Sequence, residues 1–279
     1  DLGFAPDSSF PLTYAEKGLL QVKLHGPGWE DRPLQAGRAL NVVPDKATYK
    51  GERLEELLPV IEQSGVNYTE ETRAVTVLGL SKHSKDAAEG VNAIVGLAES
   101  LSLIQPHPAL LFIADAVGED ATGAALFGEI KDEPSGALSF NIATLSIDEE
   151  RSEIGIDIRI PVLADKDALV ERLTEVAASY QLQYEEFDYL APLYVPLDSP
   201  LVSTLMKVYQ EETGDQTPAM SSGGATFART MENCVAYGAL FPDALQTEHQ
   251  ANERAKLDDL YRAMEIYAET IRQLAGKEA

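Results

Sequence analysis

The strongest constraint on the fold is the alternation of apolar and polar residues between positions 153 and 160. Ile156 and Ile158 fall on one face of an extended chain, while Asp157 and Arg159 fall on the other. A period of two over this length predicts a β-strand with one face in a core, and Pro161 ends it.

Strands and helices alternate through the middle of the chain. Apolar residues recur every three or four positions in the segments predicted as helices, which are 52–63, 91–101, 106–117 and 167–180. Short apolar runs between turn residues predict the strands, which are 19–24, 39–43, 74–78, 140–147, 153–160 and 183–189. This order predicts an α+β fold, with helices on one face of an antiparallel sheet.

The last third of the chain is separated from this region by a predicted domain boundary. Residues 194–200 carry two prolines around Asp198 and Ser199, and a helix is predicted over 201–213. A final helix is predicted from a stripe that we expect to face the core, made of Leu257, Leu260, Met264, Tyr267, Ile271 and Leu274.

Charge and cysteine content exclude several classes of partner. The chain has 279 residues, with 22 basic and 46 acidic side chains and a net charge of −24. Phosphate binding requires clustered Lys and Arg, so neither nucleic acid nor an anionic membrane is expected as a partner. No apolar run approaches the roughly 18 residues of a membrane span. Cys234 is the single cysteine, which rules out an intrachain disulfide and fits a reducing location such as the cytoplasm.

The stretch from Ser221 to Glu253 carries the pattern most suggestive of chemistry. Gly223 and Gly224 allow the backbone to approach a ligand closely and to point N–H groups at an anion. His249 lies in a short polar loop before the last helix, and an imidazole flanked by carboxylates can serve as a metal ligand. Taken alone, a histidine beside a glutamate is more often a surface residue than a metal ligand, so His249 by itself favours the surface position.

The order of these pieces resembles the end of the dinuclear zinc dipeptidases. The matching segments are Gly-Gly-Ala-Thr-Phe-Ala-Arg from 223, Asn-Cys-Val-Ala from 233, and Glu-His-Gln-x-Asn-Glu from 248. The family is that of the PepV-like bacterial dipeptidases, relatives of carnosinase, aminoacylase and carboxypeptidase G. The resemblance implies that His249 is a zinc ligand and that Gly223 and Gly224 help to hold the substrate's C-terminal carboxylate. Ala251 departs from the family, which usually has Pro there, and we expect a slightly looser loop.

Four further residues lie in motifs of the same family. The opening Gly-Phe-x-Pro-Asp-x-x-Phe-Pro, followed by Glu-Lys-Gly, resembles a mid-chain segment in which the residue matching Asp7 ligates zinc. Asn41 resembles an Asn that contacts the substrate carboxylate, His83 a His that donates to the oxyanion, and Arg159 an Arg that grips the carboxylate.

Each of these four residues also has a plainer interpretation that the sequence leaves open. Asp7 could cap a turn, Asn41 could satisfy a strand edge, and His83 could simply be exposed. Arg159 could pair at the surface with Asp157 or Glu153.

The resemblance implies a domain organisation and a function. Residues 1–15 and 197–279 correspond to the C-terminal part of a catalytic domain, and residues 16–196 to an inserted α+β lid domain. In the family, the remaining zinc ligands and the general base lie upstream of the segment that matches the start of this chain. Because the chain starts at Asp1, we expect a fragment that is inactive alone. Metal binding by the fragment is left open.

For the full-length protein the resemblance implies a metal-dependent dipeptidase with two zinc ions. Its substrate is expected to be a dipeptide or small peptide, and a monomer is favoured. Two alternatives remain: a non-catalytic α+β module for binding or dimerisation, and the same fold acting on N-acyl amino acids.

Overall fold

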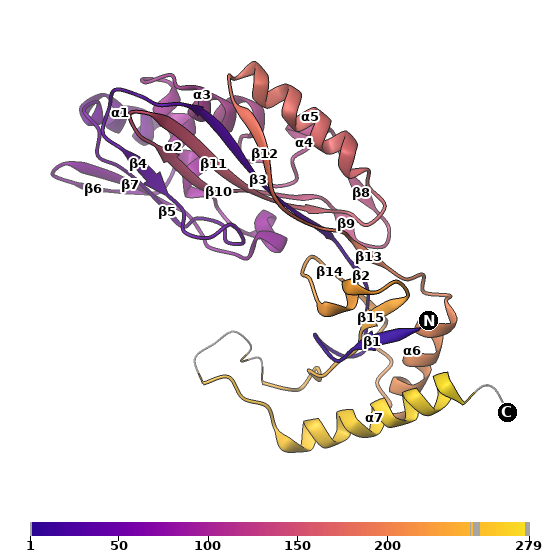
Figure 1. Ribbon diagram of the computed structural model, residues 1–279. Coiled ribbons are helices and arrows are strands. Elements are labelled where there is room, and N and C mark those ends of the chain that lie inside the picture. The colour runs from indigo at the N-terminus through magenta and orange to yellow at the C-terminus, as the bar shows by residue number, and fades with distance from the viewer. Residues whose placement is uncertain (1, 246, 248–251, 277–279) are drawn as a thin grey trace. The chain divides into compact units, whose positions relative to one another are not determined.

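The computed structural model describes residues 2–245, 247 and 252–276, and the chain divides into two compact units (Figure 1). Unit 1 comprises Asp1–Lys17 and Ala191–Ala279, and unit 2 comprises Gly18–Leu190. The second boundary lies before the proline-rich segment because β13 (Leu193–Tyr194) pairs with β2 (Thr13–Glu16) inside unit 1. The mixed α and β fold predicted from the sequence is confirmed, with sheets and packed helices in the structure.

The main sheet of unit 2 is antiparallel and has five strands in the order β12-β3-β11-β10-β4. The strands are β3 (Gly18–Pro27), β4 (Leu34–Ala36), β10 (Ser139–Ile147), β11 (Arg151–Ile160) and β12 (Gln183–Leu190). Strand β11 is the alternating segment of the sequence. Its residue Ile156 lies opposite Val22 on one neighbour and Ile142 on the other, so three apolar side chains meet on one face.

Helices and two smaller sheets complete unit 2. The sheets are β5-β7-β6, with β5 (Lys46–Tyr49), β6 (Tyr68–Glu71) and β7 (Ala74–Leu78), and the pair β8 (Lys131–Asp132) with β9 (Gly136–Ala137). The α-helices are α1 (Leu54–Ser64), α2 (Ala93–Ser102), α3 (Pro108–Leu111), α4 (Ala124–Phe127) and α5 (Lys166–Ser179). A 3-10 helix, η1 (Ser84–Glu89), and a π-helix, η2 (Phe112–Val117), are also present. Helices α2 and α3 pack on the main sheet, and α5 packs beside β12 (Figure 1).

Both faces of β11 are buried, which the alternation alone does not indicate. Its isoleucines enter the apolar core, while Asp157 and Arg159 on the opposite face are 0% and 2% exposed. The segment around Leu40 and the helix η1 cover this second face. A Cβ added to Gly155 would lie 2.7 Å from Leu40 Cδ2, so this position needs glycine for Leu40 to lie against the strand.

The predicted strand over residues 39–43 is wrong. Val42 makes one isolated β-bridge to His83, and strands form instead on either side of the segment, as β4 and β5. The carbonyls of Leu40 and Val42 accept hydrogen bonds from the side chain of Asn141 rather than from a sheet neighbour. A tertiary contact therefore overrides the local preference for an extended strand.

Unit 1 is built on a small mixed sheet in the order β1-β15-β2-β13, with β14 also paired to β2. The strands not yet given are β1 (Gly3–Ala5), β14 (Met220–Ser222) and β15 (Cys234–Ala236). The helices are α6 (Pro200–Thr213), α7 (Leu257–Ala275) and the 3-10 helix η3 (Phe227–Thr230). Aromatic rings fill the core of the unit, with Phe10 in contact with Tyr209, Tyr237 and Phe241.

Most of the apolar stripe of α7 is exposed and does not face the core as predicted, although Tyr267 packs against Phe4 and donates to the carbonyl of Tyr237. Leu257 and Met264 are 68% and 62% exposed, whereas Ala263, Ile266 and Thr270 are buried. Both sets recur at helical spacing, and the smaller side chains form the buried one. Within the described residues, none of the helices has the length and apolar character that a membrane crossing requires.

Candidate functional site

Two predicted site residues of unit 2, Asn41 and His83, lie on neighbouring segments of chain. The segments run antiparallel, with a β-bridge between Val42 and His83. The N–H of Ser84 donates to the carbonyl oxygen of Asn41 at 2.9 Å. The side chains of Asn41 and His83 are both exposed. Residues 42 positions apart in the sequence are thus brought side by side.

The ring of His83 is held by a backbone hydrogen bond. Its Nδ1 accepts the N–H of Lys85 at 3.1 Å, which caps the start of η1. Loss of water around part of the ring lowers the pKa of His83 from its ordinary value, and the positive charges of Arg159 and Lys85 act in the same direction. Asp157 and Asp86 oppose this shift without reversing it. The neutral ring accepts at Nδ1, so its proton is on Nε2.

Arg159 is bound to Asp157 on the buried face of β11. Its Nε lies 2.6 Å from Asp157 Oδ1 and its second terminal nitrogen 3.1 Å from Oδ2, a bidentate arrangement. Gln21 also donates to Asp157 Oδ2, at 2.9 Å. The pairing with Asp157 considered from the sequence is therefore present, but in the interior rather than at the surface. Ser139, which lies opposite Arg159 on β10, donates to the carbonyl of Ser84, so Arg159 and His83 come from adjoining segments. The role of Arg159 in substrate binding stays a prediction.

The predicted residues of unit 1 include a glycine pair that follows β14. The N–H of Gly224 donates to Ser222 Oγ at 2.9 Å, and the carbonyl of Gly224 accepts from the guanidinium of Arg229 at 3.0 Å. Gly223 lies in the same loop. The loop is thus held from within unit 1, and its use as a carboxylate site stays a prediction.

Arg229 forms a buried ion pair with Glu16. The two side chains are 6% and 0% exposed, and Nε and a terminal nitrogen of Arg229 lie 3.1 and 3.0 Å from Glu16 Oε2. Thr226 donates to the same carboxylate through its N–H and its hydroxyl. Arg229 also donates to the carbonyls of Lys17 and Ala191, the residues at which unit 1 connects to unit 2.

Asp7 lies in the loop after β1 and is half-buried. Its Oδ2 accepts a long hydrogen bond of 3.4 Å from the N–H of Phe227. The other predicted metal ligand, His249, lies outside the described residues. Within the part of the chain that the structure describes, no group of three or more His, Cys, Asp or Glu side chains could hold a metal ion. The described residues therefore do not make a complete metal site.

The sequence interpretation missed two residues that hold these loops, Glu16 and Asn141. Glu16 lies before the first predicted strand, within the Glu-Lys-Gly motif, and no local signal marks it as buried. For Asn141 the available signal is an amide within a predicted apolar strand, because such a residue is buried only with hydrogen-bond partners.

Comparison with known proteins identifies the family. The model of "Peptidase family M20/M25/M40" matches residues 14–273. "Putative dipeptidase YtjP" of Bacillus subtilis is 34% identical over 98% of this chain, and "Putative dipeptidase SH1171" of Staphylococcus haemolyticus is 27% identical over 98% of this chain. The chain spans 64% of the length of each.

The fold is also similar to that of solved structures. The crystal structure of aminoacylhistidine dipeptidase from Vibrio alginolyticus matches with a TM-score of 0.50 and 13% identity, over 96% of this chain and 64% of that one. This similarity concerns the fold alone. With the family model matched over nearly the whole sequence, the chain belongs to peptidase family M20/M25/M40.

Proposed function

We propose that the full-length protein is a metal-dependent dipeptidase that cleaves dipeptides with a free C-terminal carboxylate. One observation carries the proposal: Asn41, His83 and Arg159, far apart in sequence, come from adjoining segments of unit 2. The names of the curated relatives support the same substrate class. Unit 2 would then act as the lid that recognises the substrate.

His83 is the proposed donor to the oxyanion that forms when water attacks the peptide carbonyl. A neutral imidazole with its proton on Nε2 can donate one hydrogen bond without a change of charge. The hydrogen bond from Lys85 to Nδ1 holds the ring in one orientation, so the donor needs little reorganisation during the reaction.

Asn41 and Arg159 are the proposed contacts to the substrate's carboxylate. A guanidinium suits a carboxylate because it donates two parallel hydrogen bonds. Arg159 is buried and already bound to Asp157, so this role requires the residues that cover it to move aside when substrate binds. Gly223 and Gly224, in unit 1, are proposed separately as substrate-binding residues, and the N–H of Gly224 would have to give up its bond to Ser222 Oγ.

Zinc is the proposed metal, with Asp7 and His249 among its ligands in the full-length protein. A bound zinc ion would polarise the scissile carbonyl and lower the pKa of a bound water. A catalytic zinc takes about three protein ligands. Because the resemblance assigns only Asp7 and His249 in these 279 residues, we infer that this stretch alone does not hydrolyse dipeptides.

The test is a kinetic comparison on the full-length, zinc-loaded protein. His83→Ala should lower kcat for a dipeptide by about 10²–10³-fold, the usual effect of removing one oxyanion donor. The matched control is His25→Ala, in the same unit, whose ring pairs with Glu153 and Glu185 on the strands. Wild-type kcat in the His83→Ala variant would exclude the assignment.

A substrate panel separates the alternatives. A dipeptide, its C-terminal amide and an N-acyl amino acid should be tested with the same preparation. Loss of turnover with the amide supports carboxylate recognition, whereas preference for the N-acyl amino acid would change the substrate class. Absence of turnover with every compound would favour the non-catalytic module.

A further inference from the structure

Asn141 is a buried amide in an apolar strand. It lies on β10 directly opposite Asp157 of β11, so both side chains are on the second, polar face of the main sheet. Asn141 is 1% exposed, and its strand neighbours Phe140 and Ile142 are equally buried. An amide in such a place is costly unless it is hydrogen-bonded, so its partners indicate what it does.

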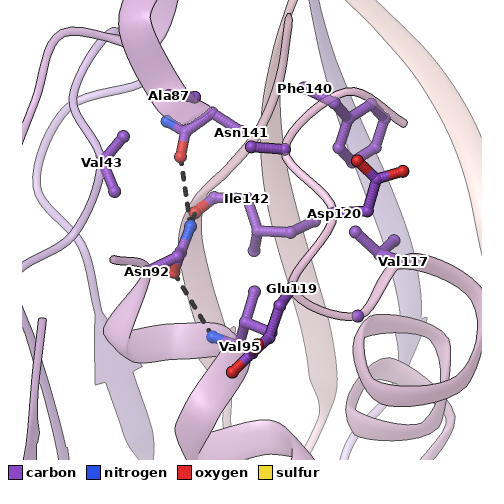
Figure 2. A pocket seen from close by; sticks show the side chains of 12 residues that line it. Val43, Ala87, Asn92, Val95, Val117, Glu119, Asp120, Phe140, Asn141 and Ile142 are labelled. Atoms are coloured by element: carbon purple, nitrogen blue, oxygen red, sulfur yellow. Dashed lines mark hydrogen bonds between the residues drawn. The ribbon is translucent and has the colours of Figure 1, made fainter. Parts of the chain in front are cut away.

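The side-chain hydrogen bonds of Asn141 go to other segments of unit 2. Its Nδ2 donates to the carbonyl of Val42 at 3.0 Å and to Ser84 Oγ at 2.9 Å, with a longer contact of 3.4 Å to the carbonyl of Leu40. Its Oδ1 accepts from Asn92 Nδ2 at 3.2 Å, as Figure 2 shows. Both donors and the acceptor of the amide are therefore used.

These partners are sequence neighbours of Asn41 and His83, the two exposed candidate residues. Leu40 and Val42 stand immediately before and after Asn41, and Ser84 immediately follows His83. Two more hydrogen bonds connect the segment of His83 to that of Asn41. Ser84 Oγ donates to the carbonyl of Leu40 at 3.0 Å, and the N–H of Ser84 donates to the carbonyl of Asn41 at 2.9 Å. A single side chain thus reaches both segments from the rigid strand beneath them.

We propose that Asn141 is a positioning residue, which sets the place of Asn41 relative to His83. The inference rests on the proposed function, in which these two side chains contact the substrate. Asn92 extends the arrangement into the helix α2, since its Oδ1 caps the helix at Ile94 and Val95 while its Nδ2 donates to Asn141 and to the carbonyl of Ile142.

Other residue types at position 141 would not reproduce these bonds. An aspartate keeps the shape but loses both N–H donors, and it would set a negative charge against the carbonyls of Leu40 and Val42. A leucine fills similar space but removes the amide donor from the carbonyl of Val42 and from Ser84 Oγ, while the carbonyl of Leu40 keeps the hydroxyl of Ser84. A smaller residue would enlarge the cavity of about 20 Å³ that Asn141 and Asn92 line (Figure 2).

The test uses Asn141→Leu in the full-length, zinc-loaded protein, because leucine adds no charge near His83. We expect kcat for a dipeptide to fall by about 10²-fold, as small misplacements of catalytic groups do. The amide of Ser84, which donates to Asn41, should exchange its hydrogen faster than in the wild type. The matched control is Leu97→Ala on α2, which removes a fully buried side chain of the apolar core and none of the hydrogen bonds of the Asn141 side chain. At a temperature where both variants are folded, it should leave kcat and Ser84 exchange unchanged.

A second variant keeps the test decisive if Asn141→Leu does not fold. Ser84→Ala removes the hydrogen bonds of the hydroxyl to Asn141 and to the carbonyl of Leu40, and it should lower kcat less, by about tenfold. Combined with Asn141→Leu, it should lower kcat by less than the product of the two single effects, since both variants lose the bond between Asn141 and Ser84. The proposal is overturned if a folded Asn141→Leu protein, or Ser84→Ala in its place, keeps wild-type kcat, or if Leu97→Ala lowers kcat equally.

Failure of the proposed function gives a different result. If the wild type hydrolyses no dipeptide, the proposed function falls, and exchange at Ser84 alone decides whether Asn141 fixes the two segments. Faster exchange in Asn141→Leu, but not in Leu97→Ala, then supports the positioning role, and equal exchange in the two variants overturns it.

Discussion

Removal of the Arg229 side chain should strongly destabilise unit 1. Arg229→Ala deletes five hydrogen bonds: two to Glu16 and one each to the carbonyls of Lys17, Ala191 and Gly224. It also leaves the carboxylate of Glu16, which is 0% exposed, with only the two donors of Thr226. Breaking a buried ion pair from one side costs about 3–5 kcal/mol. In the variant, water can replace Arg229 as the donor to the three backbone carbonyls. We therefore expect a loss in the range of a broken buried ion pair, rather than the sum of five separate hydrogen bonds.

The control for this prediction is an exposed ion pair in the same unit. Arg272 and Glu269 on α7 are 2.6 Å apart, but the Arg272 side chain is 71% exposed. Arg272→Ala should therefore change the stability of unit 1 far less than Arg229→Ala. The residue types and the substitution are the same, so the difference reports the burial of the Arg229 pair together with its bonds to backbone carbonyls.

The assay must report on unit 1 itself. The single tryptophan, Trp29, lies in unit 2, so its fluorescence would follow the other unit. Native-state hydrogen exchange at the buried amide of Val235 on β15 gives a free energy of opening for unit 1. A double variant, Glu16→Gln with Arg229→Met, should lose less than the sum of the two single losses, with a coupling of about 2–3 kcal/mol. If Arg229→Ala costs no more than Arg272→Ala, the ion pair does not hold this unit together.

Two further predictions concern titration in unit 2. His83 should titrate below the ordinary value of about 6.5 for histidine, and Arg159→Met should raise its pKa, because a nearby positive charge is lost and Asp157 is left unpaired. NMR of the His83 ring protons measures this pKa in the wild type and in Arg159→Met. Arg159→Lys is the control, because it keeps the positive charge. An unchanged pKa in Arg159→Met would show that the charge of Arg159 does not act on His83. For Asp31, burial raises the pKa, but hydrogen bonds led by that from the Tyr49 hydroxyl outweigh it and lower the pKa. This stabilisation is complete above about pH 4 and is lost as the pH falls through the folded pKa, so Asp31→Asn should cost about 1–3 kcal/mol at pH 7 and progressively less in acid. Denaturant unfolding of both proteins at several pH values measures this, and a gap that does not narrow in acid would contradict it.

Regular elements with strong local signals could be predicted from the sequence. The alternation around Ile156 predicts β11 because successive side chains of a strand must point to opposite faces. The predicted helix over 201–213 corresponds to α6, which starts at Pro200 after the cap of Ser199 and ends before Gly214. In these elements local geometry and burial favour the same structure.

Prediction failed where a distant side chain decides the local structure. The segment from Ala39 to Val43 has the composition of a strand, yet Asn141 takes two of its carbonyls. Likewise, Asp157 and Arg159 have the spacing of a solvated strand face, but a second layer of chain covers them and they pair with each other. Nothing within these segments indicates Asn141 or the layer of chain that covers β11, because both lie at long sequence separation. The pairing of Arg159 with Asp157 is local, and the sequence allowed it to be considered.

In each unit, a buried polar side chain holds the loop that carries the candidate residues. His83 and Gly224 both lie in loops, where the backbone has few sheet neighbours to hold it. In each case a buried polar side chain from a strand holds the loop: Asn141 below the segment of His83, and Glu16 below that of Gly224, through Arg229. Since a buried polar group must keep all of its partners, each loop has one favourable arrangement over its strand. Substitutions at Asn141 or Glu16 should therefore alter the candidate sites as strongly as substitutions in the loops themselves.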